Sequence, residues 1–141
     1  MKKILFILCA VMMLAACDGK SGGKKLEDKL YGEWHSTSLT VTADIYLSFT
    51  EEKTFEIYQQ IGEGAYRLYR GTWNLEEGVL MGRYNDGEDW ASSYLVTIED
   101  NVLTMTSQND AAEVSTYSYG TIPEEVRNGC EVVVKSSEAG F

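Results

Sequence analysis

Residues 44–60 have the sequence DIYLSFTEEKTFEIYQQ, in which two runs of alternating apolar and polar side chains flank the charged pair Glu51-Glu52. Alternation with period two is typical of a β-strand that presents one face to a core. The stretch therefore predicts two antiparallel strands joined by a short turn. The side chains expected to face the core are Ile45, Leu47, Phe49, Phe55 and Ile57.

The same pattern continues in both directions, and turn-forming residues interrupt it every eight to twelve positions. Most interruptions are short enough for hairpins, so sequential strands should be neighbours in space. We therefore predict an all-β protein with a single eight-stranded up-and-down antiparallel barrel, which removes exposed edges by closing on itself. The expected strands are 34–41, 44–50, 53–60, 65–75, 78–84, 90–99, 102–107 and 113–119.

The alternation also predicts which other side chains face the barrel interior. In the fourth strand Tyr66 and Leu68 occupy even-numbered positions, whereas Tyr69, Trp73 and Leu75 occupy odd-numbered ones. Even and odd positions of a strand face opposite sides, so the change suggests a bulge near residues 68–70. The remaining inward residues are expected to be Leu39, Val41, Val79, Met81, Trp90, Tyr94, Val96, Ile98, Leu103 and Met105.

A short C-terminal helix is predicted over residues 121–127. Thr121 could cap it, Pro123 suits an early helical position, and Glu124 and Glu125 lie where the helix dipole favours acids. Residues 130–134 could add a ninth strand or a packed tail, within a C-terminal segment of residues 129–141.

The N-terminus has a basic end, an apolar run from Ile4 to Leu14 and two small residues before Cys17, which is typical of a secretory signal. The apolar run is too short for a stable membrane span. Leu14-Ala15-Ala16-Cys17 resembles the lipobox of bacterial lipoproteins. The resemblance implies cleavage after residue 16, attachment of acyl chains such as palmitate to Cys17, and a lipid anchor in a cell-envelope membrane, which we expect to be the outer membrane.

Polar and glycine-rich residues follow the cysteine, so residues 17–29 are expected to form a flexible tether. Removal of residues 1–16 takes away Lys2 and Lys3 and moves the net charge from −10 to −12. Such an acidic chain argues against nucleic acid as a partner, because nucleic-acid binding requires clustered Lys and Arg. The lipid on Cys17 would make a membrane the expected partner. No feature of the sequence identifies a protein partner.

The segment Leu30-Tyr31-Gly32-Glu33-Trp34 looks like the Gly-x-Trp signature of lipocalins and related calycin barrels. Together with the hairpins and the lipobox, it makes the chain resemble small bacterial lipocalin-like lipoproteins over residues 30–128. The resemblance implies that Trp34 closes the base of the barrel. The chain departs from the family in two ways: it has no secure Thr-Asp-Tyr-like loop motif and no arginine near the last strand, since Arg127 falls on the predicted helix.

The predicted interior is rich in Trp and Tyr, which combine a large apolar face with a polar group. Such a lining could hold a small apolar or amphipathic ligand, or the rings could fill a barrel without a cavity. Both alternatives remain open on the sequence. The candidate ligand-binding residues are Trp34, Tyr69, Trp73, Trp90 and Tyr94.

The sequence contains no pattern that predicts catalysis, a cofactor or a metal site. His35 is the single histidine, and it has no recognisable nucleophile motif near it. Residues 85–89 bunch carboxylates but lack a complete calcium loop, so a tight turn is expected, with weak cation binding as the alternative. Cys130 is expected to be a buried or half-buried small apolar residue, with a reactive or intermolecular thiol as the alternative.

We therefore expect a non-enzymatic, membrane-anchored lipoprotein that binds a small apolar or amphipathic ligand in the cell envelope. The alternative function is a filled barrel that docks a protein or a glycan in an envelope complex.

The lipobox resemblance makes a direct prediction. Cys17→Ser should abolish incorporation of labelled palmitate and move the protein from the membrane fraction to the soluble envelope fraction, because the acyl chains supply the membrane affinity. Cys130→Ser is the matched control and should still be acylated. Equal labelling of the Cys17→Ser variant and the unmodified protein would contradict the anchor.

Overall fold

The computed structural model describes residues 25–37 and 43–132, so the expected signal, Cys17, Leu39, Val41 and residues 133–141 lie outside the described parts. Most of the described chain is β-structure. The elements are α3 (Leu26–Leu30), β1 (Gly32–Ser36), β2 (Ile45–Phe49), β3 (Thr54–Gly62), β4 (Ala65–Glu76), β5 (Val79–Tyr84), β6 (Tyr94–Glu99), β7 (Val102–Ser107), β8 (Val114–Tyr119), α4 (Glu124–Asn128) and β9 (Cys130–Val132).

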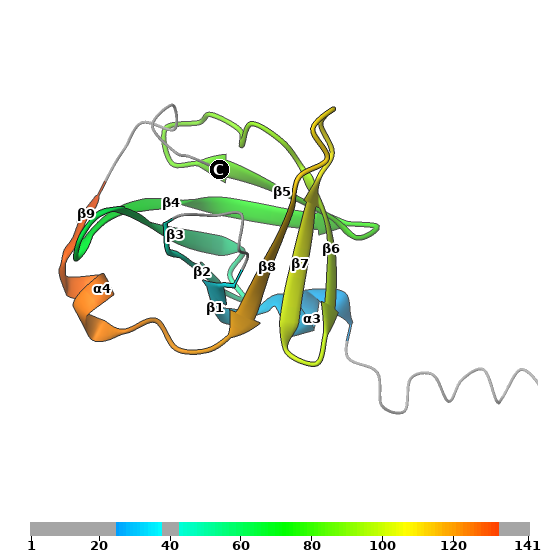
Figure 1. The fold of residues 1–141 in the computed structure, drawn as a ribbon. Helices are drawn as coiled ribbons and strands as arrows, with labels where there is room; N and C mark the ends of the chain where they lie inside the picture. The colour runs from blue at the N-terminus through cyan, green and yellow to red at the C-terminus, as the bar shows by residue number, and fades with distance from the viewer. Residues whose placement is uncertain (1–24, 38–42, 133–141) are drawn as a thin grey trace, which may run out of the picture.

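Strands β1 to β8 form a closed antiparallel barrel in which sequential strands are neighbours (Figure 1). The pairing of β1 with β8 closes the sheet, at Trp34 with Tyr119 and Ser36 with Tyr117. The short strand β9 lies parallel to β4, beyond the part of β4 that pairs with β5. The predicted fold class, eight-stranded up-and-down order and C-terminal helix are therefore confirmed.

Several element boundaries differ from the prediction. β1 begins at Gly32, whereas β6 begins at Tyr94 rather than at residue 90. Residues 26–30 form α3, so the folded part begins inside the stretch that was expected to be tether. Helix α4 begins after Pro123, and Thr121 does not cap it.

The prediction of which β5 side chains face the barrel interior was wrong. Leu80 and Tyr84 face the core and are buried, whereas Met81 is 38% exposed. The reason is Gly82, which occupies an inward position without a side chain and so hides the alternation. A Cβ at Gly82 would collide with the indole ring of Trp90, which fills that space.

The predicted bulge near residues 68–70 is also wrong, because β3 and β4 stay in register from Thr54–Thr72 to Gln60–Tyr66. Tyr66 and Leu68 point outwards, where α4 covers them, whereas Tyr69 and Trp73 point inwards. The apolar residues of β4 therefore change from even to odd positions because the strand packs against a core on each of its faces. The outer core contains Tyr46, Tyr58, Tyr66, Leu68, Ile122 and Val126, with Cys130 packed against it.

Helix α3 covers the base of the barrel. Leu30 is fully buried, and its carbonyl oxygen accepts a hydrogen bond of 3.0 Å from the Trp34 indole. Lys53 forms an ion pair with Glu27 of α3 and lies 4.4 Å from the ring centroid of Trp73. Trp34 therefore lies at the base of the barrel, beside α3.

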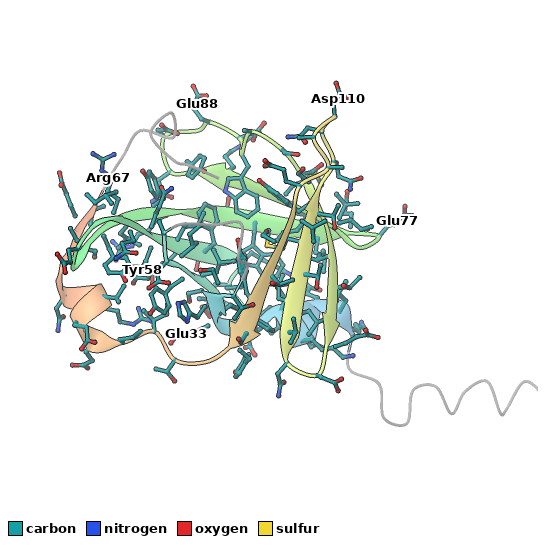
Figure 2. The ribbon with its side chains drawn as sticks, in the orientation of Figure 1. Glu33, Tyr58, Arg67, Glu77, Glu88 and Asp110 are labelled. Atoms are coloured by element: carbon teal, nitrogen blue, oxygen red, sulfur yellow. The ribbon has the colours of Figure 1, made fainter. Side chains whose placement is uncertain are left out.

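A partly buried charge cluster attaches α4 to the barrel. Arg127 pairs with Glu33 of β1 and donates hydrogen bonds to Glu56 at 3.3 Å and to the Tyr58 hydroxyl at 2.9 Å. Glu33 and Tyr58 lie on the wall that α4 covers (Figure 2). Burial tends to raise the pKa of Glu56, but hydrogen bonds from Tyr58 and Arg70 and the charge of Arg127 lower it below its ordinary value.

Gly71→Ala tests the close approach of β4 and β5. The added methyl group would press on the backbone carbonyl of Arg83 and lie 2.8 Å from the Phe55 ring, so the strands must separate. We expect a loss of about 1–3 kcal/mol in the free energy of unfolding, measured by urea denaturation. Gly120→Ala is the control, because its methyl group meets no atom within 4 Å. Equal stability of the two variants would contradict this packing.

Arg127→Met tests the charge cluster. The variant leaves the partly buried carboxylate of Glu33 without its cation and removes one of the two arginines that pair with Glu56. We expect a loss of about 1–3 kcal/mol in unfolding free energy at neutral pH. Because the pKa of Glu56 is lowered by folding, its contribution is present above the pKa of an unfolded glutamate and disappears as the pH falls through the folded pKa. The loss should therefore shrink in acid. Arg67→Met, which removes an arginine outside the cluster, should change stability by less than about 0.5 kcal/mol.

Candidate functional site

The five candidate ligand-binding residues all lie inside the barrel, and each is less than 10% exposed. The structure does not bring all five together. Trp34 and Trp73 lie at the base beside α3, and Trp73 donates a hydrogen bond of 3.0 Å to the Thr54 carbonyl. Trp90 contacts Tyr94, and Tyr69 contacts Tyr84. Trp73 and Trp90 line one cleft whose lining does not include the other three residues, so the five residues do not form one site.

Aromatic rings contact one another across the interior. Phe55 lies 5.1 Å from Trp90 and 5.8 Å from Tyr84 between ring centroids, and Trp90 lies 5.9 Å from Tyr94. Such edge-on contacts leave little space between the rings, and an eight-stranded barrel is narrow enough for side chains to fill it. The described interior is therefore packed. Its fully buried members include Trp34, Leu47, Phe55, Tyr69, Leu80, Leu103 and Met105.

The end of the barrel away from α3 is rich in tyrosine. Burial raises the pKa of Tyr94 to about 12, and the nearby Tyr117 and Glu113 act in the same direction. Burial also raises the pKa of Tyr84, and the nearby Tyr94 and Tyr69 raise it further. These phenols stay neutral at physiological pH. The prediction from sequence missed Tyr84, although its spacing from Leu80 placed both residues on one parity.

The outer wall made by β6, β7 and β8 carries almost no charge. Each strand presents three side chains outwards, and Glu99 is the charged residue among them. We call this surface the β6–β8 face. Cross-strand register places Thr97 beside Thr104 and Thr104 beside Thr116. The uncharged members of the β6–β8 face are Leu95, Thr97, Val102, Thr104, Thr106, Val114, Thr116 and Ser118.

This face contrasts with the rest of an acidic chain of net charge −10. Glu77, Glu88 and Asp110 project from turns at the rim of the barrel (Figure 2). Leu95 is 44% exposed and Val114 is 52% exposed. The exposed part of this face therefore combines aliphatic and hydroxyl groups and little charge.

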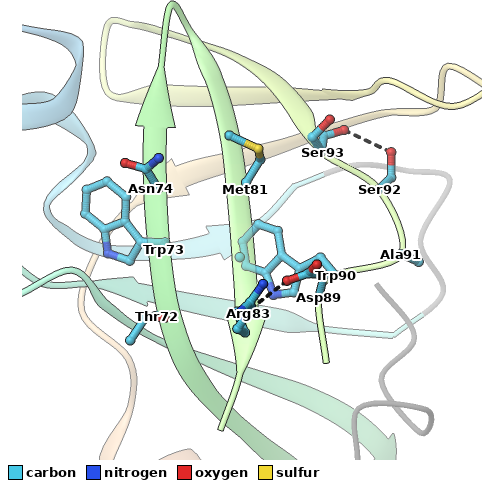
Figure 3. Close-up of a pocket in the computed structure, with 11 residues that line it drawn as sticks. Thr72, Trp73, Asn74, Met81, Arg83, Asp89, Trp90, Ala91, Ser92 and Ser93 are labelled. Carbon is cyan, nitrogen blue, oxygen red and sulfur yellow. Dashed lines mark hydrogen bonds and ion pairs between the residues drawn. The ribbon is translucent and has the colours of Figure 1, made fainter. Parts of the chain in front are cut away.

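A cleft of about 560 Å³ opens beside the β6–β8 face, between β4, β5 and the segment that leads into β6 (Figure 3). Met81 lies in the middle of this cleft, between Asn74 on β4 and the loop that carries Ser92 and Ser93. Its lining residues are Thr72, Trp73, Asn74, Met81, Gly82, Arg83, Asp89, Trp90, Ala91, Ser92 and Ser93.

The acidic loop at residues 85–89 forms a turn. The Gly87 amide donates to the Tyr84 carbonyl at 2.9 Å, and the Asp86 carboxylate accepts a hydrogen bond of 3.0 Å from the Glu88 amide. Asp89 pairs with Arg83. Within residues 25–37 and 43–132, the structure shows no cluster of three His, Cys, Asp or Glu side chains suited to a metal ion.

His35 lies outside the barrel wall. Its imidazole stacks on the Tyr46 ring at 4.3 Å between centroids and contacts the Asp44 carboxylate at 3.2 Å. Cys130 is half-buried, and its thiol donates to the Arg127 carbonyl at 3.2 Å. In the described ranges, no helix combines the length and the apolar character needed to cross a bilayer.

No protein-family description matches the sequence, and no curated protein matches it. The fold is similar to that of a protein from Bacteroides uniformis whose structure was determined by NMR, with a TM-score of 0.50 and 17% sequence identity. The similarity covers 67% of this chain and 91% of the other. At this identity it concerns the fold alone, a closed eight-stranded antiparallel barrel.

Proposed function

We propose that the mature protein is a lipid-anchored, lipocalin-like lipoprotein of the cell envelope that binds its target on the outer surface of the barrel. The packing of aromatic rings across the interior carries this proposal, since a filled barrel leaves the outer walls for binding. Of these walls, helix α4 covers β2, β3 and part of β4. Among residues 25–37 and 43–132, no helix or strand packs over the β6–β8 face or the adjacent cleft.

The length of the N-terminal segment supports an orientation for this surface. Eight residues separate Cys17 from Leu26, the first residue of α3, and a fully extended chain spans at most about 3.6 Å per residue. A lipid on Cys17 would therefore hold the base of the barrel within about 30 Å of the membrane. Glu88 in the turn at residues 85–89 lies at the other end of the barrel, so this end would face away from the bilayer (Figure 2).

A ligand inside the barrel remains the second candidate function. Tyr69, Tyr84, Trp90 and Tyr94 gather buried rings and neutral hydroxyl groups at the end away from α3, and such groups suit an amphipathic molecule. The Gly-x-Trp resemblance also favours this function. It would require these packed rings to move apart.

Native mass spectrometry separates the two functions. Residues 18–141, purified from the natural host, should show the mass of the bare chain both before and after denaturation and should not enhance the emission of an apolar fluorescent probe, because the interior is filled. Leu80→Ala removes a fully buried side chain, and the dry void that results should bind the probe. A small-molecule adduct on the unmodified chain that is lost on denaturation would overturn surface binding in favour of luminal binding.

A further inference from the structure

The cleft beside the β6–β8 face arises from a mismatch between two neighbouring segments. Leu80 of β5 pairs with Tyr94 of β6, and Gly82 accepts a hydrogen bond of 2.9 Å from the Trp90 amide. Between these contacts, Met81 alone opposes residues 91–93. The longer segment must therefore bow outwards, which opens the cleft above Met81 (Figure 3).

Hydrogen bonds hold the bowed segment in place. The amide of Gln108, at the end of β7, donates to the Ser93 carbonyl at 2.9 Å and to the Ser92 hydroxyl at 3.2 Å. The Ser92 hydroxyl in turn donates to the Ser93 carbonyl at 2.9 Å. Hydrogen bonds within the protein thus anchor the rim of the cleft to the end of β7.

Neutral hydrogen-bonding groups surround the cleft. Thr72 and Asn74 contribute a hydroxyl and an amide from β4, and Ser93 contributes a hydroxyl from the opposite rim. Within the described parts of the chain, these three side chains have no hydrogen-bond partner, so a ligand can use them. Met81 supplies an apolar floor that is 38% exposed.

The charges at the cleft neutralise each other. Arg83 Nε donates to Asp89 Oδ1 at 2.8 Å, and more than half of each side chain is exposed. A charged ligand would find no net opposite charge here, and an anion would also be repelled by a chain of net charge −10.

We propose that this cleft binds a sugar unit of a neutral glycan. A sugar ring presents hydroxyl groups at its edge and apolar C–H groups on its faces, which matches a ring of hydroxyl and amide groups around an apolar floor. The volume of about 560 Å³ falls within the range typical of small-molecule sites. Further units of the glycan would continue over Leu95 and the threonines of the β6–β8 face. This inference rests on the proposed function, because it identifies the class of target.

The test is a titration of isotope-labelled residues 18–141 with maltohexaose and, separately, with chitotetraose, followed by amide and methyl NMR shifts. We expect at least one of these neutral glycans to give saturable shifts centred on Asn74, Met81 and residues 91–93. The double variant Asn74→Ala, Ser93→Ala should weaken this binding about tenfold, because two hydrogen bonds are lost. Asn128→Ala on α4 is the matched control and should bind as the unmodified chain does.

The remaining outcomes overturn the inference. If neither glycan shifts the residues of the cleft, or if the double variant binds as tightly as the control, the cleft is not a sugar site, whereas surface binding still stands on the mass-spectrometry result. Saturable shifts centred on the luminal Val96, Leu103 and Met105 would overturn both the sugar site and the proposed surface binding. Enhanced binding of an acidic uronate oligomer over both neutral glycans would refute the assignment of a neutral ligand.

Discussion

Three residue pairs join β1 to β8: Trp34 with Tyr119, His35 with Ser118, and Ser36 with Tyr117. These pairs bring together the two ends of the barrel sequence and turn an open sheet into a closed one. Without them the first and last strands would expose unpaired backbone groups, and the inward aromatic side chains would face water. Gly32 permits this pairing of β1 with β8, because it has a φ of 131° and a Cβ there would lie 2.6 Å from the Tyr119 ring.

Closure also explains why the two walls of the barrel differ. The chain leaves β8 beside β1, and helix α4 then packs over β2, β3 and the first half of β4, where Ile122 and Val126 join the outer tyrosines. Arg127 fixes the helix by binding Glu33, which is next to Trp34 in the sequence but lies on the opposite face of β1. The covered wall therefore supports the fold, while β6, β7 and β8 have no element packed outside them among the described residues.

The distribution of charge follows the same division. Ion pairs at Glu33, Glu56 and Arg127 lie under α4, and the acidic residues of the turns project at the rim, whereas the β6–β8 face carries hydroxyl and aliphatic groups. An uncharged surface on an acidic protein can approach a neutral partner without the cost of removing water from carboxylates. The bowed segment at residues 91–93 adds a concave element to this otherwise regular surface. Local shape and local neutrality thus occur together on one side of the barrel.

The sequence by itself determined the fold class, because period-two alternation between short turns leaves few arrangements other than a closed antiparallel sheet. It also placed most inward residues correctly, since alternation reports which face of a strand is buried. Only the tertiary structure decided that Tyr66 and Leu68 pack under α4 and that Met81 faces outwards. Alternation cannot distinguish a second core from a bulge, and an inward Gly82 leaves no apolar signal.

The candidate site was less accessible from the sequence than the fold. Trp73, Trp90, Tyr69 and Tyr94 were correctly placed in the interior. Whether rings fill a barrel or line a cavity depends on distances between strands that are remote in sequence. The cleft arises because one residue of β5 opposes three residues of the segment before β6, between the pairs Leu80–Tyr94 and Gly82–Trp90. This mismatch involves two segments, so neither segment reveals it alone. The sequence therefore determined which residues alternate, and the tertiary structure decided which surfaces those residues leave open, because register and packing are properties of pairs of segments.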